Sequence, residues 1–160
     1  MNVHIRPMRM EDLPQAAAIE RICFTQEAWS EKVYREEYAR MGTWIWFWCA
    51  IGENASVLGT ISLTRAGDDG EIGNVAVLPK FRRQGIARKL LTEAIRFGER
   101  EQNLQAFTLE VRAGNAAAIR LYEAAGFHEE GRRPRFYTEP VEDALIMWRH
   151  KERETKGHRP

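Results

Sequence analysis

The sequence predicts an α/β fold of the α+β kind, in which helices flank a mixed, mostly antiparallel β-sheet. Three strands, near residues 44–51, 56–65 and 70–78, follow one another with turn-forming Gly, Asn and Asp residues between them, which is typical of an antiparallel meander. Apolar residues then recur at helical spacing over residues 85–102. Strand-like and helix-like segments alternate after that helix, and this order predicts one sheet covered by helices.

The first forty residues predict a strand and two helices. Residues 2–8 read as the strand. The first helix is expected at about 11–25, with acidic residues at its start and Pro14 in its first turn, where proline is tolerated. The second helix is expected at about 30–41, because the side chain of Ser30 can accept a hydrogen bond from the free amides of its first turn.

The second half of the chain predicts a strand at 106–112, a helix at 115–125 and a final pair of strands near 127–137 and 141–149. Apolar and polar residues alternate over 106–112, so this strand has two unlike faces, and Glu110 lies on the polar one. The polar face of this strand, with Glu110 on it, is therefore a candidate place for functional residues.

Length and composition indicate one soluble domain. We expect it at residues 1–150 of the 160, followed by a charged tail at 151–160 that frays beyond the last strand. Hydrophobic residues make up 44% and charged residues 29%, and the net charge of +1 argues against direct binding of nucleic acid through a basic field. No run approaches the roughly 18 apolar residues of a membrane-spanning helix, so no membrane partner is expected.

The cysteines and histidines indicate a reducing compartment and no metal. Cys23 and Cys49 form no Cys-x-x-Cys motif, and the N-terminus has no signal-peptide pattern, which favours the cytoplasm. The four histidines lie apart and show no ligand spacing with the cysteines, so no metal site is expected. There is also no Gly-x-Ser-x-Gly elbow, which argues against a serine hydrolase.

The residues that follow the strand at 70–78 predict a cradle for a pyrophosphate. A helix opens near Gly85, and its first amide N–H groups have no partners within the helix, so they face outward at the positive end of the helix dipole. Arg82, Arg83 and Arg88 add positive charge, and the small Gly85 and Ala87 let a diphosphate approach the backbone. The alternative is an ordinary turn that caps an amphipathic helix.

A second motif lies between the strand at 106–112 and the helix that follows it. Asn115 is a good N-cap for the helix at 115–125. Tyr122 comes seven residues later, about two helical turns on, so it can face back along the strand that carries Glu110. The spacing permits a shared site, in which Asn115 can serve both as a cap and as a ligand contact.

The two motifs together resemble those of the GNAT superfamily of N-acetyltransferases. Arg82-x-x-Gly85-x-Ala87 matches the acyl-CoA signature of that superfamily, although many relatives carry a second Gly where Ala87 stands. The resemblance implies acetyl-CoA as cosubstrate and a sheet splayed between its fourth and fifth strands, where the pantetheine arm pairs with the sheet edge.

The residues around the expected splay fit such a ligand. Gly73-Asn74 interrupts the strand pattern as a bulge would, whether ordinary or functional, and leaves backbone groups beyond it for the cofactor's amides. The expected cofactor-binding residues are Val75, Ala76, Val77, Arg82, Arg83, Gln84, Gly85, Ile86, Ala87, Arg88, Asn115 and Tyr122.

Over nearly its whole length the chain is similar to the RimI family of ribosomal-protein-alanine N-acetyltransferases. The likeness is carried by Ile5-Arg6-Pro7-Met8 near the start, by the segment Leu109 to Phe127, and by Pro140-x-Glu142-Asp143-Ala144-Leu145 near the end. It implies transfer of acetyl to a protein N-terminal amine, that of the alanine of a small-subunit ribosomal protein. Phe136-Tyr137 stands where that family has a Tyr-Tyr-rich turn, and these two residues are expected to flank the acceptor or simply to pack.

Acetyl transfer from a thioester to an amine needs a base, an oxyanion donor and an acid. An α-amine titrates near pH ~8, so a modest base suffices, and Glu110 is the candidate, directly or through a water. Tyr122 is the candidate acid for the departing thiolate, and the N–H of Val77 is a plausible oxyanion donor. The alternatives are a solvated glutamate on a polar strand face and a tyrosine that packs in an amphipathic helix.

The sequence is also compatible with two other functions. The same fold serves small amines, so a small-molecule amine acetyltransferase is one alternative, which predicts a deep acidic pocket. A non-catalytic acyl-CoA-binding module is the other, and the presence of both Glu110 and Tyr122 speaks against it. The sequence makes no prediction of the oligomeric state and assigns no role to Trp44, Trp46 and Trp48, which fall on one face of a predicted strand.

Overall fold

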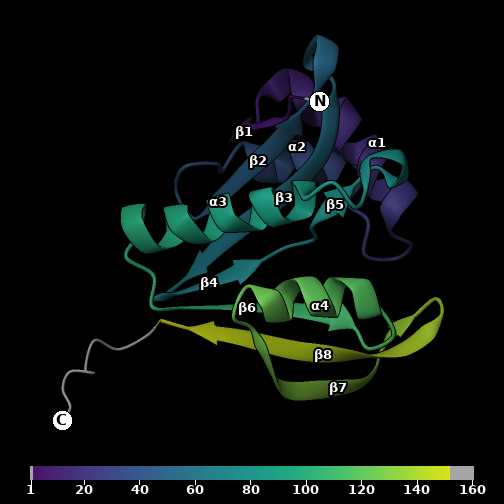
Figure 1. The fold of residues 1–160 in the computed structure, drawn as a ribbon, viewed down its shortest axis with the longest axis vertical. Coiled ribbons are helices and arrows are strands. Elements are labelled where there is room, and N and C mark those ends of the chain that lie inside the picture. Colours follow the sequence, from purple (N-terminus) through teal and green to yellow (C-terminus); the bar gives the residue numbers. More distant parts are fainter. Residues whose placement is uncertain (1, 152–160) are drawn as a thin grey trace.

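A computed structural model describes residues 2–151 of the chain, and these residues form an eight-stranded sheet with helices on both faces (Figure 1). The strands are β1 (His4–Pro7), β2 (Ile45–Ile51), β3 (Val57–Ala66), β4 (Asp69–Ile72), β5 (Ala76–Val77), β6 (Ala106–Arg112), β7 (His128–Thr138) and β8 (Val141–His150). The helices are α1 (Leu13–Cys23), α2 (Glu31–Tyr38), α3 (Ile86–Glu101) and α4 (Ala116–Ala124), with single 3-10 turns at η1 (Met10–Asp12), η2 (Glu53–Ala55) and η3 (Pro79–Phe81).

The sheet order is β1-β2-β3-β4-β6-β8-β7, and β5 pairs with β3 beside β4. Every adjacent pair is antiparallel except β4 and β6, which run parallel. The predicted mixed and mostly antiparallel sheet is therefore confirmed, as is the meander of β2, β3 and β4.

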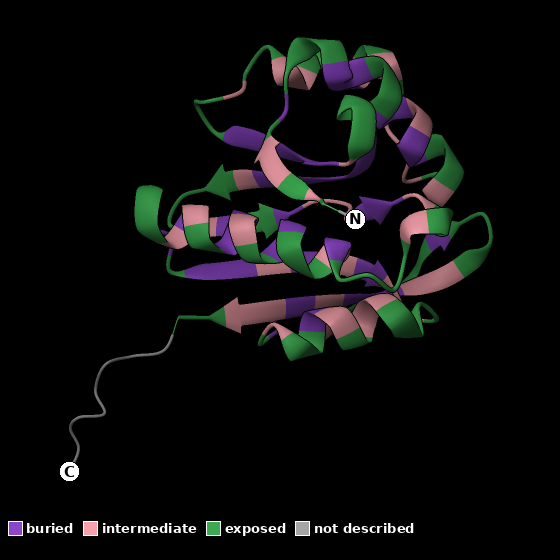
Figure 2. Cartoon of the chain, turned by 45° about the horizontal axis from the view of Figure 1, so that its top comes forward, coloured by how far each residue is buried: buried purple, intermediate pink, exposed green. Residues whose placement is uncertain are grey.

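Two cores lie on opposite faces of the sheet. Helices α1 and α2 cover one face, where Leu13, Tyr34 and Phe47 are buried, and α3 and α4 cover the other, where Leu90 and Phe107 are buried (Figures 1 and 2). All seven residues of β2 are buried, because this strand is covered on both sides. The continuous apolar run of β2 thus reflects its place between two helical layers.

The predicted tryptophan row is only partly correct. Trp46 and Trp48 share the α3 face of β2, and both pack against Phe97, with ring centroids 5.2 and 5.3 Å apart. Trp44 lies before the strand and is 50% exposed, with the guanidinium of Arg40 5.6 Å from its ring. The buried pair of tryptophans therefore has a packing role.

The predicted helices are present but shorter than expected. Residues 10–12 form a separate 3-10 turn before α1, which ends at Cys23, and α2 ends at Tyr38. The cap at Ser30 is confirmed, since its Oγ accepts a hydrogen bond of 3.2 Å from the N–H of Val33. The earlier end of α1 leaves residues 24–30 as a loop, and several of them line the candidate site.

The single strand predicted at 70–78 is wrong, because the chain breaks there into β4 and β5. β4 pairs with β6 only over Asp69–Glu71, opposite Ala106–Thr108, whereas β5 stays with β3. Beyond Thr108, β6 continues with β8 alone. The two halves of the sheet therefore diverge between β5 and β6, which confirms the predicted splay.

The C-terminal tail predicted from the sequence lies almost entirely outside the residues that the structure describes. The charged tail at 151–160 falls there except for Lys151. Within residues 2–151 no helix is both long and apolar enough to cross a membrane.

The packing of α3 on β6 gives a stability prediction. A Cβ at Gly98 would lie 2.6 Å from Cε2 of Phe107, a fully buried ring. Helix propensity alone would make Gly98→Ala stabilising by about 1 kcal/mol. We expect the overpacking to win, so that the variant loses about 1–3 kcal/mol in the free energy of unfolding measured by urea denaturation.

The matched control is Thr92→Ala at an exposed position of the same helix. It should change the free energy of unfolding by no more than about 0.5 kcal/mol. A Gly98→Ala protein at least as stable as the wild type would contradict the packing seen here.

Candidate active site

Three adjoining cavities follow the splay of the sheet. The middle one, of about 210 Å³, lies between the β4–β5 break and β6, and Glu110, Asn115, Tyr122 and Tyr137 all line it. It shares Asn115 and Tyr122 with a larger groove of about 660 Å³ at the start of α3. On its other side it shares Glu110 and Tyr137 with a groove of about 260 Å³. We call these the reaction cavity, the α3 groove and the acceptor-side groove.

The α3 groove contains most of the residues predicted to bind the cofactor. The predicted residues that line it are Val75, Val77, Arg82, Arg83, Gly85, Ile86, Ala87, Arg88, Asn115 and Tyr122. Ala76 and Gln84 are not among its lining residues, whereas Phe81 and Leu121, which the sequence did not single out, are.

The backbone at the start of α3 has the predicted cradle geometry. Gly85 caps the helix in the left-handed region, at φ +79°, and the first intrahelical bond runs from Lys89 N–H to its carbonyl. The N–H groups of Ile86, Ala87 and Arg88 therefore precede that bond and have no acceptor within the helix. Because the dipole of a 16-residue helix is also positive at this end, the groove suits an anion such as a phosphate.

The register of β5 corrects one predicted contact. The hydrogen bond of Leu78 N–H to Leu58 O, two residues along in the same register, places Ala76 as the hydrogen-bonding partner of Thr60. The backbone groups of Ala76 therefore point into the sheet. The sequence had predicted them to be free for a ligand, and that prediction is wrong. The backbone groups of Val75 and Val77, one residue to either side, point toward the splay.

Two side chains already occupy part of that edge. The carbonyl of Val77 accepts hydrogen bonds from the thiol of Cys23 at 3.4 Å and from Nε of Arg82 at 2.9 Å. Arg82 thus fastens the loop before α3 to the end of β5. The N–H of Val77, on the same side of the strand, remains directed at the splay.

Glu110 and Tyr122 come from consecutive elements of the chain, β6 and α4, and both line the reaction cavity. Glu110 lies on β6, where its carboxylate accepts a hydrogen bond of 2.8 Å from Nε of Arg133 on β7. Tyr122 lies on α4, is 6% exposed, and packs on Phe127 with ring centroids 5.9 Å apart. Burial first, and then the nearby Tyr137, raise the pKa of Tyr122, so its hydroxyl holds its proton.

The predicted cap at Asn115 is confirmed. Its side-chain oxygen accepts a hydrogen bond of 3.2 Å from Ala118 N–H, which fixes the start of α4. The residue lines both the reaction cavity and the α3 groove, so the cap lies where the two join.

Phe136 and Tyr137 both line the acceptor-side groove, but differently. Phe136 is 45% exposed, whereas Tyr137 is buried and also lines the reaction cavity. Burial, followed by the negative charges of Glu27 and Glu110, raises the pKa of Tyr137 to about 12. Tyr137 therefore forms the partition between the two cavities, while Phe136 lies at the outer groove.

The acceptor-side groove contains carboxylates that the sequence analysis missed. Glu20, Glu27 and Glu71 line it together with Glu110. Glu20 is buried and accepts hydrogen bonds from Trp29 N–H and from the side chain of Asn74, and burial raises its pKa. Burial and then the charge of Glu110 raise the pKa of Glu71. No local pattern marked these residues, because their elements meet only in the folded sheet.

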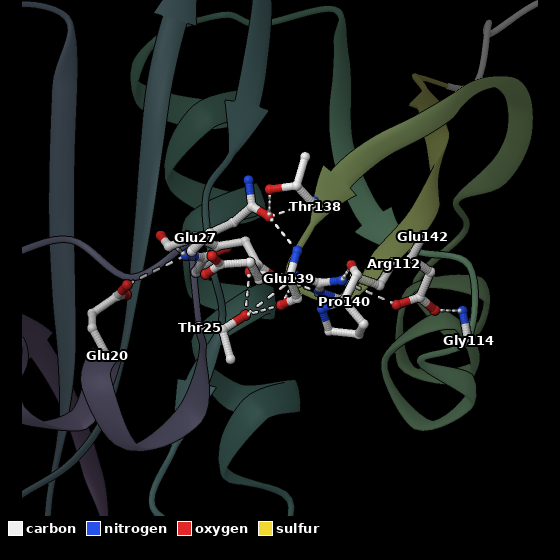
Figure 3. A network of polar contacts seen from close by, with 11 residues as sticks. Glu20, Thr25, Glu27, Arg112, Gly114, Thr138, Glu139, Pro140 and Glu142 are labelled. Atoms are coloured by element: carbon white, nitrogen blue, oxygen red, sulfur yellow. Dashed lines mark hydrogen bonds and ion pairs between the residues drawn. The ribbon is translucent and has the colours of Figure 1, made fainter.

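Polar contacts tie the loop at 24–30 to the turn between β7 and β8, on the side of the reaction cavity (Figure 3). Arg112 at the end of β6 is the centre of this network and bonds both Glu27 and Glu142. Among residues 2–151 no group of three or more His, Cys, Asp or Glu side chains is arranged to hold a metal ion.

These features are those of an acyl-CoA-dependent transferase, and comparison with known proteins agrees. The sequence model of the Acetyltransferase (GNAT) family matches residues 13–127. The chain therefore belongs to this family and is an N-acetyltransferase, as the two sequence motifs predicted. The family relationship also accounts for the splayed sheet.

Individual members of the family are similar to this chain over most of its length. The chain is 34% identical over 149 residues to the [ribosomal protein bS18]-alanine N-acetyltransferase of Escherichia coli K12, covering 89% of this chain and 94% of the relative. The crystal structure of the E. coli ribosomal-protein-S18-alanine N-acetyltransferase superposes with a TM-score of 0.83 at 30% identity, over 99% of this chain and 100% of that one. The NatC complex bound to a Gag peptide and CoA has a chain with a TM-score of 0.79 at 26% identity, over 95% and 100% of the two chains.

Proposed function

We propose that this protein transfers the acetyl group of acetyl-CoA to the α-amine of a protein N-terminus, and that its target is the N-terminal alanine of a ribosomal protein in the cytoplasm. One acetyltransferase domain over residues 1–150 would carry this activity. The observation that supports it is the single cavity that Glu110 and Tyr122 line, between a groove suited to a phosphate and a groove with four carboxylates. The name of the E. coli relative supports the alanine acceptor.

The α3 groove suits the diphosphate and pantetheine of acetyl-CoA. The amides of Ile86, Ala87 and Arg88 would hold the diphosphate, with Arg83 and Arg88 lining the same groove. The backbone groups of Val75 would pair with the pantetheine amides, as a strand added to the sheet edge, while the carbonyl of Val77 stays bonded to Cys23 and Arg82. A Cβ added at Gly85 meets no atom within 4 Å, so the space in front of this turn is open to a ligand.

The reaction cavity supplies the three groups that the chemistry needs. Glu110 takes a proton from the amine, directly or through a water, as the amine attacks the thioester carbonyl. The N–H of Val77 donates to the oxyanion that forms on that carbonyl. When the tetrahedral intermediate collapses, the bond to sulfur breaks, and Tyr122 gives its proton to the CoA thiolate. The raised pKa of Tyr122 keeps that proton in place until then.

The four glutamates of the acceptor-side groove favour one alternative, a small cationic amine as acceptor. A non-catalytic acyl-CoA-binding protein is the other, and it leaves the presence of both Glu110 and Tyr122 in one cavity without a purpose. A direct assay separates the three possibilities.

Purified protein should acetylate a peptide that begins Ala-Arg, with the acetyl group located on the α-amine by tandem mass spectrometry. The control peptide has the same sequence with a blocked N-terminus and one internal lysine, and spermidine tests the small-amine alternative. Modification restricted to the lysine or to spermidine would reject an N-terminal acceptor, and binding of CoA without any transfer would support the binding module.

The proposed acid and base give a second prediction. Glu110→Gln and Tyr122→Phe should each lower kcat by about 10²- to 10⁴-fold, while the Kd for CoA measured by calorimetry stays the same, because neither side chain holds the diphosphate. Glu123→Gln, an exposed neighbour of Tyr122 on α4, is the control and should keep full turnover. Full turnover in both active-site variants would overturn the assignment.

The cradle gives a third prediction, with a matched control for backbone strain. Gly85 and Gly67 both have positive φ, +79° and +63°, and neither has an atom within 4 Å of an added Cβ. An alanine at either position costs about 1 kcal/mol in backbone strain. Only Gly85→Ala should raise the Kd for CoA, by about tenfold, because only this turn presents the amides of α3. Equal affinities of the two variants would argue against the cradle.

A further inference from the structure

Arg112 makes more polar contacts than the chemistry above requires. Its side chain is 14% exposed and lies between two carboxylates. Nε and Nη2 donate to the two carboxylate oxygens of Glu27 at 3.0 and 3.1 Å, and Nη1 donates to Glu142 at 3.2 Å. The hydrogen bonds and charges of both glutamates raise the pKa of Arg112, so its charge is permanent.

The remaining donors of Arg112 reach the backbone of the β7–β8 turn. Nη1 donates to the carbonyl of Pro140 at 2.9 Å, and Nη2 donates to that of Glu139 at 3.1 Å. The guanidinium also stacks on the ring of Tyr137, 4.2 Å from its centroid. One side chain of β6 therefore contacts the loop at 24–30, the turn at 138–142 and the tyrosine between the two cavities.

A second residue joins the same two segments. Oε1 of Gln26 accepts hydrogen bonds from the N–H groups of Thr138 at 2.6 Å and Glu139 at 3.0 Å. The residues joined by these bonds are more than 110 positions apart in the sequence, and Figure 3 shows the loop and the turn side by side. Glu142 continues the network to Gly114 N–H at 2.6 Å, directly before the cap residue Asn115.

We propose that Arg112 is a positioning residue that latches the loop at 24–30 to the β7–β8 turn and so sets the acceptor side of the active site. The proposal rests on the proposed function. Glu27 and Tyr137 line both the reaction cavity and the acceptor-side groove, and Arg112 holds both of them. Their positions decide how an acceptor passes from one cavity to the other.

Arg112 acts through these neighbours and not on the substrate. It lines the reaction cavity, but each of its three nitrogens already donates to protein oxygens. A planar guanidinium can make this set of bonds, whereas a lysine ammonium at the same place could satisfy only part of it. Without the cation, the carboxylates of Glu27 and Glu142 would repel each other and separate the loop from the turn.

The test compares Arg112→Met and Arg112→Lys with the wild type in steady-state kinetics on the Ala-Arg peptide. We expect Arg112→Met to raise the KM for the peptide by about tenfold, while the KM for acetyl-CoA and the pH profile of kcat stay within about twofold. Arg112→Lys should recover part of the loss, because it restores one ion pair. Arg96→Met removes an exposed ion pair to Glu93 on α3 and should change neither KM.

Hydrogen–deuterium exchange gives a readout that does not depend on the acceptor. In Arg112→Met the amides of residues 24–30 and 138–142 should exchange faster, while those of α3 remain as in the wild type. If Arg112→Met is active and its KM for the peptide is unchanged, the positioning role is wrong. It is also wrong if the KM values for the peptide and for acetyl-CoA both rise, and rise as much in Arg112→Lys as in Arg112→Met. If the wild type does not acetylate the peptide, the proposed acceptor is wrong, and unchanged exchange in both segments would then overturn the latch independently.

Discussion

The site depends on one constraint, the divergence of β5 from β6. β5 remains hydrogen-bonded to β3 while β6 remains bonded to β8, so beyond Thr108 no strand of residues 2–151 pairs with the facing edges of β5 and β6. An unpaired strand edge is unfavourable unless water or a ligand satisfies its N–H and C=O groups. The α3 groove and the reaction cavity open along this edge, so a ligand with amides of its own can complete the sheet.

The charges around the splay are arranged along a line. Backbone amides and arginines lie at the start of α3, and Glu20, Glu27 and Glu71 lie at the opposite end, with Glu110 and Tyr122 between them. A negatively charged donor and a positively charged acceptor therefore approach from opposite ends without competing for one surface. The net charge of +1 conceals this separation, which exists only in the folded chain.

Local sequence signals predicted those parts of the site that are themselves local. The cap at Asn115, the two-turn spacing to Tyr122 and the turn at Gly85 each depend on a few consecutive residues, and all three are present in the structure. The pairing of Ala76 was predicted wrongly because a register is set by the partner strand, here through Leu58 and Thr60.

Contacts between distant segments were beyond what the sequence could predict. Arg133 reaches Glu110 from β7, and Glu27 reaches Arg112 from the loop after α1. Each pair is brought together only by strand order, and a charged residue in a loop or on an exposed strand is usually solvated. The break between β4 and β5 was interpreted as a bulge because Gly73-Asn74 is compatible with both, and only the different partners of the two strands distinguish them.

The surroundings of the four glutamates explain why Glu110 is the one suited to act as the base. Glu27 is held by the nearly buried Arg112, and burial raises the pKa values of Glu20 and Glu71. Glu110 is paired with Arg133, whose side chain is 56% exposed. An ion pair this exposed contributes about 1 kcal/mol or less, so an incoming ammonium can replace Arg133 at little cost. Replacement of Arg112 would instead leave Glu27 and Glu142 facing each other without a cation, which is why the latch persists while the base is free to exchange its partner.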